Sequence, residues 1–204
     1  MLIRNLIPIL SILIFLTGCS ASYKQLSVIE NKEPSNFQEH LLNEYKKRAI
    51  FEAEEMHDWN SAKLYSEKAL ESLETDKIYP QNVSYWKLPE ESIEEIRIAY
   101  DNLITIYEDA KKIDPLNLAK AISSLDCWSE QQEENWQTWD ISGCKNDFLN
   151  AMHNIYEKIS FLEKEQESIN DEGDNLENKS KNEVTIVTKN ENEDLMQIIY
   201  FDFD

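Results

Sequence analysis

Apolar residues recur every three or four positions along most of the chain between residues 37 and 162, which is the spacing of amphipathic α-helices. Gly occurs only three times and Pro five times, so few breaks interrupt the pattern. Five helices are predicted, with apolar positions that run from Phe37 to Met56, Ala62 to Leu73, Ile93 to Ala110, Leu118 to Leu125 and Phe148 to Leu162. The expected fold class is all-α, with one helical domain over residues 35–162.

Polar and turn-forming residues mark the ends of these helices. Ser35 stands where the N-cap of the first helix is expected, and Asp114 followed by Pro115 is typical of an N-cap and a first helical residue. Residues 58–60 separate the first two helices, which predicts a helical hairpin. An irregular turn is expected over residues 139–143, before the fifth helix.

The second helix of this hairpin resembles the second helix of a tetratricopeptide repeat over residues 62–70, where Ala62 and Ala69 are suitably spaced. The preceding helix lacks that family's pattern, and no copy recurs at the repeat length of about 34 residues. The resemblance implies a TPR-like hairpin scaffold that binds a protein partner, without a repeat array.

The two ends of the chain differ from the helical domain. Residues 1–18 combine one positive charge with a short apolar run and small residues, as in a secretory signal peptide. Residues 19–34 are polar without a helical period, which predicts a tether. Residues 163–195 are rich in Glu, Asn, Lys and Asp and predict a disordered acidic linker, and residues 196–204 predict an isolated C-terminal β-strand.

The end of the signal resembles the lipobox of bacterial lipoproteins. Leu16, Thr17 and Gly18 precede Cys19, whose sulfur receives a diacylglycerol in that class and whose amine is then acylated. Two or more acyl chains give stable anchoring where one gives marginal binding. Ser20 follows the cysteine where an Asp would retain the protein at the inner membrane, so the resemblance implies the outer membrane, with the chain facing the periplasm.

The net charge of the whole chain is −20, with 40 acidic and 20 basic residues. Removing residues 1–18 takes away only Arg4 among the charged residues and makes the mature chain more acidic still. Nucleic acid is disfavoured as a partner because phosphate binding needs clustered Lys and Arg. The same charge repels anionic headgroups, so membrane contact must come from the lipid on Cys19.

Two further cysteines, Cys127 and Cys144, would be exported into a compartment that permits disulfides. A disulfide between them is favoured and would stabilise the fold by about 3 kcal/mol in the chain-entropy model. Two free thiols are one alternative. A metal site is the other, although no suitably spaced His accompanies the pair.

Residues 198–204, IIYFDFD, resemble the first strand of the OmpA-like domain, a periplasmic module that binds peptidoglycan. Residues 127–137, together with Cys144 and Phe148, are similar to amino-terminal regions of OmpA-family lipoproteins of alphaproteobacteria, as are residues 54–62. The resemblance implies a structural, non-enzymatic envelope protein. The segments that supply the wall-contacting Asp and Arg are absent, so we expect peptidoglycan binding only in full-length relatives, and the strand as the stump of a missing domain.

Two groups of residues carry candidate chemistry. Glu54 and His57 form one copy of the Glu-x-x-His half-motif that di-iron proteins use twice, so surface residues are expected there rather than a metal site. Glu130, Glu133 and Glu134 suggest a peptidoglycan-cleaving glycosidase, but surface glutamates commonly share a helix face in this way.

No catalytic, cofactor-binding or metal-binding residues are predicted, and the chain is expected not to be an enzyme. Nothing in the sequence resembles an activated Ser or Cys nucleophile or a Gly-rich phosphate loop. The tryptophans are expected to be core or loop anchors rather than a sugar-binding platform. They are Trp59, Trp86, Trp128, Trp136 and Trp139.

Overall fold

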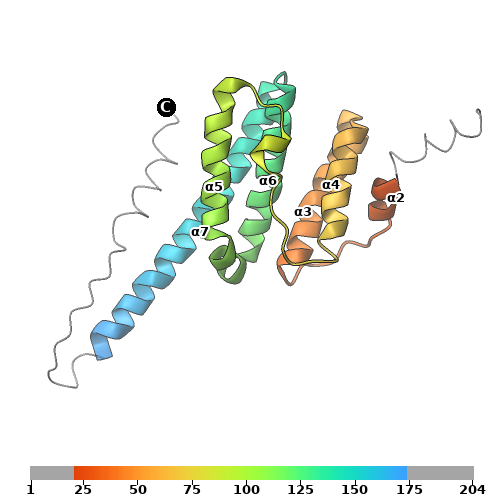
Figure 1. Ribbon diagram of the computed structural model, residues 1–204. Helices are drawn as coiled ribbons and strands as arrows, with labels where there is room; N and C mark the ends of the chain where they lie inside the picture. The colour runs from red at the N-terminus through yellow and green to blue at the C-terminus, as the bar shows by residue number, and fades with distance from the viewer. Residues whose placement is uncertain (1–20, 174–204) are drawn as a thin grey trace, which may run out of the picture. The chain divides into compact units, whose positions relative to one another are not determined.

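The computed structural model describes residues 21–173, with side chains as far as Glu165. This part of the chain contains six α-helices and no β-strand, which confirms the all-α prediction for it (Figure 1). The helices are α2 (Ala21–Ser27), α3 (Phe37–Phe51), α4 (Trp59–Glu71), α5 (Glu90–Ile113), α6 (Pro115–Glu134) and α7 (Thr138–Gly173). A π-helical segment, Glu52–Met56, extends α3, and a 3₁₀ turn, Val83–Tyr85, lies between α4 and α5.

The described residues fall into two units, one that ends at Lys158 and one that begins at Ile159. In the first unit α3 packs against both α4 and α6, α5 packs against α6, and α2 packs against α4 (Figure 1). The α3–α4 pair is the helical hairpin that the sequence predicts. The described part of the second unit is the continuation of α7 to Gly173.

The N-caps of α3 and α6 lie where the sequence predicts them, except that the α3 cap is shifted by one residue. Asn36, not Ser35, is the N-cap of α3, because its side chain accepts a hydrogen bond from the Glu39 backbone N–H. Ser35 instead donates its backbone N–H and its hydroxyl to the Glu39 carboxylate. Asp114 caps α6 with Pro115 in the first turn, as predicted.

The predicted tether is wrong for residues 21–27, which form α2, whereas residues 28–34 contain no helix. Leu26 is fully buried, and the Tyr23 hydroxyl donates to the Glu54 carboxylate at 2.9 Å. The extended segment that follows is fixed by the Lys46 ammonium, which donates to the Ile29 carbonyl and the Asn31 side chain. One buried leucine in two turns leaves no hydrophobic period, so the sequence pattern could not reveal this helix.

Two further boundaries differ from the prediction at the ends of α7. Residues 139–143 are helical rather than an irregular turn, and the break between α6 and α7 lies at residues 135–137. At the other end α7 continues to Gly173, so the first part of the predicted disordered linker is helical. A helix satisfies its own backbone groups, and the Glu and Lys residues at 163–165 favour it without a buried face. The rest of the linker, the closing strand, the signal peptide and Cys19 lie outside the described residues.

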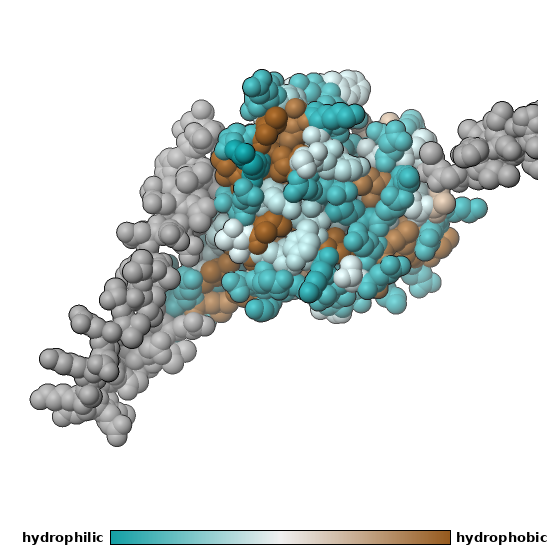
Figure 2. All heavy atoms as spheres, in the orientation of Figure 1, coloured by the Kyte–Doolittle hydropathy of each residue, from teal (hydrophilic) through white to brown (hydrophobic). Residues whose placement is uncertain are grey.

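Helix α6 is the most enclosed element, with buried residues on every side. Trp128 is buried on it and packs against Phe148 of α7, with the ring centroids 6.0 Å apart. Cys127 is bonded to Cys144 of α7, with the two Cα atoms 5.7 Å apart, a usual separation for a disulfide. Figure 2 shows one face of the molecule, on which hydrophilic residues predominate and hydrophobic residues form separate patches.

A buried charge on α6 organises the packing of the hairpin. Asp126 is 1% exposed and accepts hydrogen bonds from the Tyr45 hydroxyl of α3 at 2.7 Å and the Gln81 backbone N–H at 2.6 Å. The Lys68 ammonium of α4 lies 3.6 Å from the same carboxylate and donates to the Tyr79 carbonyl. Burial raises the pKa of Asp126, whereas Lys68 and the two hydrogen bonds oppose that shift.

We predict that Asp126→Ala lowers the free energy of unfolding by about 3–5 kcal/mol, because it leaves the buried Lys68 ammonium without its carboxylate. Urea denaturation of the disulfide-bonded protein measures the loss. Glu94→Ala, which breaks an exposed ion pair with Arg97, is the control and should cost less than about 1 kcal/mol. Similar losses in the two variants would contradict a central role for Asp126.

Candidate functional site

A cavity of about 450 Å³ opens where α3 turns into α4. The π-helical segment widens the end of α3, and His57 ends it in the left-handed conformation, with φ of 58°. Asp58 then caps α4 by accepting from the backbone N–H groups of Asn60 and Ser61. The cavity lining includes Glu52, Asp58, Trp59, Glu134 and Trp136, and contains no Lys or Arg.

Three carboxylates converge beside this cavity. One oxygen from each of Asp58, Glu130 and Glu134 lies within 4.8 Å of the other two. Glu130 and Glu134 are one turn apart on α6, and the hairpin turn brings Asp58 to them. The sequence prediction had placed Glu130, Glu133 and Glu134 on one face of a helix. The structure brings two of them together and directs Glu133 elsewhere, where it accepts from the Lys87 backbone N–H.

Glu130 is buried and its carboxylate is well supplied with donors. The Ser61 hydroxyl and the Gln131 side-chain amide donate to it, and the Tyr65 hydroxyl lies 3.4 Å away. Burial nevertheless raises the pKa of Glu130 to about 7, since the hydrogen bonds from Ser61 and Gln131 only partly offset the loss of water.

Glu52 is more isolated than Glu130. Its residue is 3% exposed, it lines the cavity, and its carboxylate makes no hydrogen bond or ion pair with any described residue. Burial, together with the negative charges of Glu130 and Asp58, raises the pKa of Glu52 to about 8. The buried acid is therefore held largely protonated at neutral pH.

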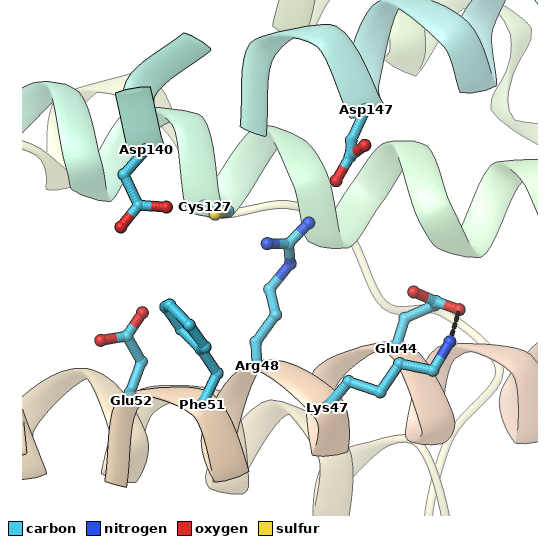
Figure 3. A pocket seen from close by; sticks show the side chains of 8 residues that line it. All are labelled: Glu44, Lys47, Arg48, Phe51, Glu52, Cys127, Asp140 and Asp147. Atoms are coloured by element: carbon cyan, nitrogen blue, oxygen red, sulfur yellow. Dashed lines mark hydrogen bonds and ion pairs between the residues drawn. The ribbon is translucent and has the colours of Figure 1, made fainter. Parts of the chain in front are cut away.

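Glu52 also lines a second, smaller cavity of about 210 Å³ between α3, α6 and α7. Figure 3 shows Glu52, the first residue of the π-helical segment, and Asp140 on α7 with their carboxylates directed toward each other across this space. Asp140 is 9% exposed, and its Oδ2 atom has no hydrogen-bond partner among the described residues. Burial raises the pKa of Asp140, and the nearby Arg48 opposes that shift.

Arg48 lines the same cavity as these acids, but its guanidinium is already engaged. It donates to the hydroxyls of Ser123 and Ser124 at 2.9 Å each and contacts the Cys144 sulfur at 3.8 Å. In Figure 3 it extends from α3 toward the disulfide, beside the acidic pair rather than between the two carboxylates. The Arg48 side chain thus leaves the Glu52 carboxylate without a hydrogen-bonded counter-ion.

The other candidate residues are separated by the structure. Glu54 accepts from Tyr23, while the His57 Nδ1 atom lies 3.3 Å from the Ala53 carbonyl oxygen, so the Glu-x-x-His pair does not converge on one point. Trp128 and Trp86 are buried anchors as predicted. Trp136, in the loop between α6 and α7, and Trp139 are largely exposed, and Trp59 is 47% exposed.

Sequence reasoning missed Glu52 and Asp58 as members of this site. The sequence indicates only that Asp58 lies in the break between two helices. Its proximity to Glu130 and Glu134 of α6 depends on tertiary packing. Glu52 lies in a run of acidic residues that resembles a solvated helix face. Its burial follows from the π-helical turn, and the spacing of hydrophobic residues in the sequence does not predict such a turn.

No protein-family model, curated protein or solved structure matches this chain. Among the described residues, no helix has the length and apolar character needed to cross a membrane. The site must therefore be interpreted from its own chemistry, which is a set of carboxylates around a cavity without a cationic side chain. Such an arrangement attracts a cation.

We predict that Glu52 makes the protein less stable as pH rises. The folded pKa of about 8 lies above the ordinary 4.5, so the stability due to its proton is present below about pH 4.5 and is lost as pH rises through 8. Glu52→Gln, which mimics the protonated acid, should match the wild type at acidic pH. At alkaline pH it should be more stable by at least about 1 kcal/mol.

Thermal unfolding across this pH range, in buffer with EDTA to remove bound ions, measures the difference. Glu108→Gln, which neutralises an exposed acid on α5, is the matched control and should follow the wild-type curve. Parallel curves for the wild type and Glu52→Gln would contradict the raised pKa.

Proposed function

We propose that this chain is an exported lipoprotein, anchored in the outer membrane through acyl chains on Cys19 and facing the periplasm. The observation that carries the proposal is the sequence Leu16-Thr17-Gly18-Cys19 directly after a short apolar run. The Cys127–Cys144 disulfide supports it, because such bonds persist in oxidising compartments and are rare in the cytosol.

The helical body is proposed to act as a non-enzymatic structural module of the envelope. The resemblance of residues 127–137 and 198–204 to OmpA-family lipoproteins supports this role. Two buried acids are also occupied in packing: Asp126 joins α6 to the hairpin, and Glu130 is surrounded by hydroxyl and amide donors.

A second candidate function is that of an adaptor that binds a periplasmic protein through the TPR-like hairpin. Exposed aromatic rings near the hairpin turn favour it. Trp59 is 47% exposed and Trp136 71% exposed, and both line the larger cavity. Tryptophan is enriched at protein interfaces, where it supplies much of the binding energy.

We predict that Cys19→Ala releases the full chain from the membrane fraction, because the variant lacks the lipid that anchors it. Mass spectrometry of the wild-type mature amino terminus should find a lipid-modified cysteine at residue 19. Ser20→Ala, which leaves the cysteine intact, is the control and should remain with the membranes. An unmodified mature terminus, or membrane retention of Cys19→Ala, would contradict the proposal.

The adaptor hypothesis predicts that a photo-crosslinking residue at Trp136 captures one discrete protein in intact cells. The same residue at Tyr85, an exposed aromatic between α4 and α5, serves as the control. A band obtained at Trp136 and absent at Tyr85 supports the adaptor. The same pattern of bands at both positions, or no band at Trp136, argues against it.

A further inference from the structure

Two tryptophans from different parts of the fold line the larger cavity. Trp59, the first residue of α4, is 47% exposed, and Trp136, in the loop between α6 and α7, is 71% exposed. Both belong to the lining of the cavity of about 450 Å³. Single exposed apolar residues are common on protein surfaces, but two tryptophans that line one cavity indicate a surface that binds something.

Both indole rings are held in place by neighbouring side chains. The Tyr23 ring of α2 packs against Trp59 in a T-shaped arrangement, with the ring centroids 5.8 Å apart. Asn135 ends α6 in the left-handed conformation, with φ of 51°. In the next residue, Trp136, the Nε1 atom donates to the Glu134 carboxylate at 3.2 Å. A surface that is already ordered loses less conformational entropy when it binds a partner.

The charge of the cavity lining favours a cationic ligand. The lining includes Asp58 and Glu134 and contains no Lys or Arg. Both oxygens of Asp58 accept hydrogen bonds at the start of α4, so this residue contributes charge but not a free acceptor. Glu134 is exposed, and only its Oε2 atom accepts a hydrogen bond from the described residues. Its Oε1 atom can therefore accept from a donor outside the chain.

An arginine side chain combines the properties that this surface requires. Trp is the best of the aromatic residues for cation–π contacts, and Arg makes such contacts more often than Lys. The guanidinium is planar and weakly hydrated, so it stacks on an aromatic ring and can still donate to a carboxylate. A volume of about 450 Å³ is also within the range of about 300–1,000 Å³ that is usual for ligand pockets, which leaves room for one long side chain.

We propose that Trp59, Trp136 and Glu134 bind an arginine side chain of a partner protein. The guanidinium stacks on the indole rings and donates to the Oε1 atom of Glu134. This inference rests on the adaptor function proposed above, and it specifies the partner as a protein that presents an exposed basic segment. Trp and Arg are both enriched among the residues that dominate binding energy, and such residues tend to pair across an interface. The acidic surroundings would also speed association with a basic partner.

Fluorine NMR of the full chain, labelled with 5-fluorotryptophan and purified in detergent, tests the proposal with a defined probe. The probe is a blocked peptide, Gly-Gly-Arg-Gly-Gly, and the control peptide carries citrulline, which keeps the shape of arginine without its charge. KCl at about 0.15 M screens non-specific attraction to the acidic surface. Tryptophan-to-phenylalanine variants assign the signals.

We expect the arginine peptide to shift the signals of Trp59 and Trp136 saturably and the citrulline peptide to bind at least tenfold more weakly. Trp139 is 64% exposed but lies outside the cavity lining, so its signal should not move. Equal shifts with both peptides, equal shifts of all three tryptophans, or no shift would overturn the proposal.

Two matched charge changes on α6 locate the guanidinium. Glu134→Gln keeps an acceptor for the Trp136 indole, so the ring should stay in place, and it should weaken binding of the arginine peptide at least fivefold. Glu133→Gln makes the same change one residue away, where the carboxylate accepts from the Lys87 backbone N–H, and should change affinity less than twofold. Equal weakening in both variants would mean a general effect of acidity and would overturn the site.

The arginine site and the adaptor function can fail separately. A partner captured by the photo-crosslinking residue, together with no response of the chain to the arginine peptide, would retain the adaptor and overturn the arginine site. Binding of the arginine peptide without any captured partner would support the site and contradict the adaptor.

Discussion

The packing of the first unit depends on how the buried Asp126 carboxylate is satisfied. Tyr45 from α3, Lys68 from α4 and the Gln81 backbone of the α4–α5 connection all reach it. A buried charge is tolerated only where it is paired and hydrogen-bonded, so these three segments must be placed together for α6 to be buried at all. The irregular segment between α4 and α5 is fixed in the same way, through Lys68 on the Tyr79 carbonyl and Tyr107 on the Ile78 carbonyl.

The same logic extends along α6. Because this helix is enclosed on every side, its inward polar residues need partners from its neighbours. The Arg48 guanidinium donates to the hydroxyls of Ser123 and Ser124, and the Ser61 hydroxyl donates to the Glu130 carboxylate. These hydrogen bonds follow one another along α6 from residue 123 to residue 130, and they fix the register of the hairpin against α6. Apolar side chains can stay in contact after a small shift of one helix along another. A buried carboxylate cannot tolerate such a shift, because it would lose its hydrogen-bond donors.

The sequence predicted the helices whose burial is periodic and missed the features that depend on tertiary contacts. The α3–α4 hairpin and the Asp114–Pro115 start of α6 follow from local spacing and capping, which act within one element. Helix α2 is too short to show a period, and its stability comes from Leu26 and from the Tyr23–Glu54 contact across the fold. Glu130 could be proposed as part of an acidic group, but its partners could not, because Glu52 and Asp58 are brought to it by the hairpin.

The surroundings of Asp126 and of Glu130 on α6 differ in a way that packing does not explain. At Asp126 the donors match the acceptors, and one ammonium faces one carboxylate. Near Glu130 several carboxylates lie close together, the Glu52 carboxylate has no partner among the described residues, and the pKa values of Glu52 and Glu130 are raised toward neutrality. An apolar residue at position 52 would remove that electrostatic cost without loss of any hydrogen bond made by its side chain. The burial of Glu52 and Glu130 beside this cavity is therefore not explained by the stability of the helices around it.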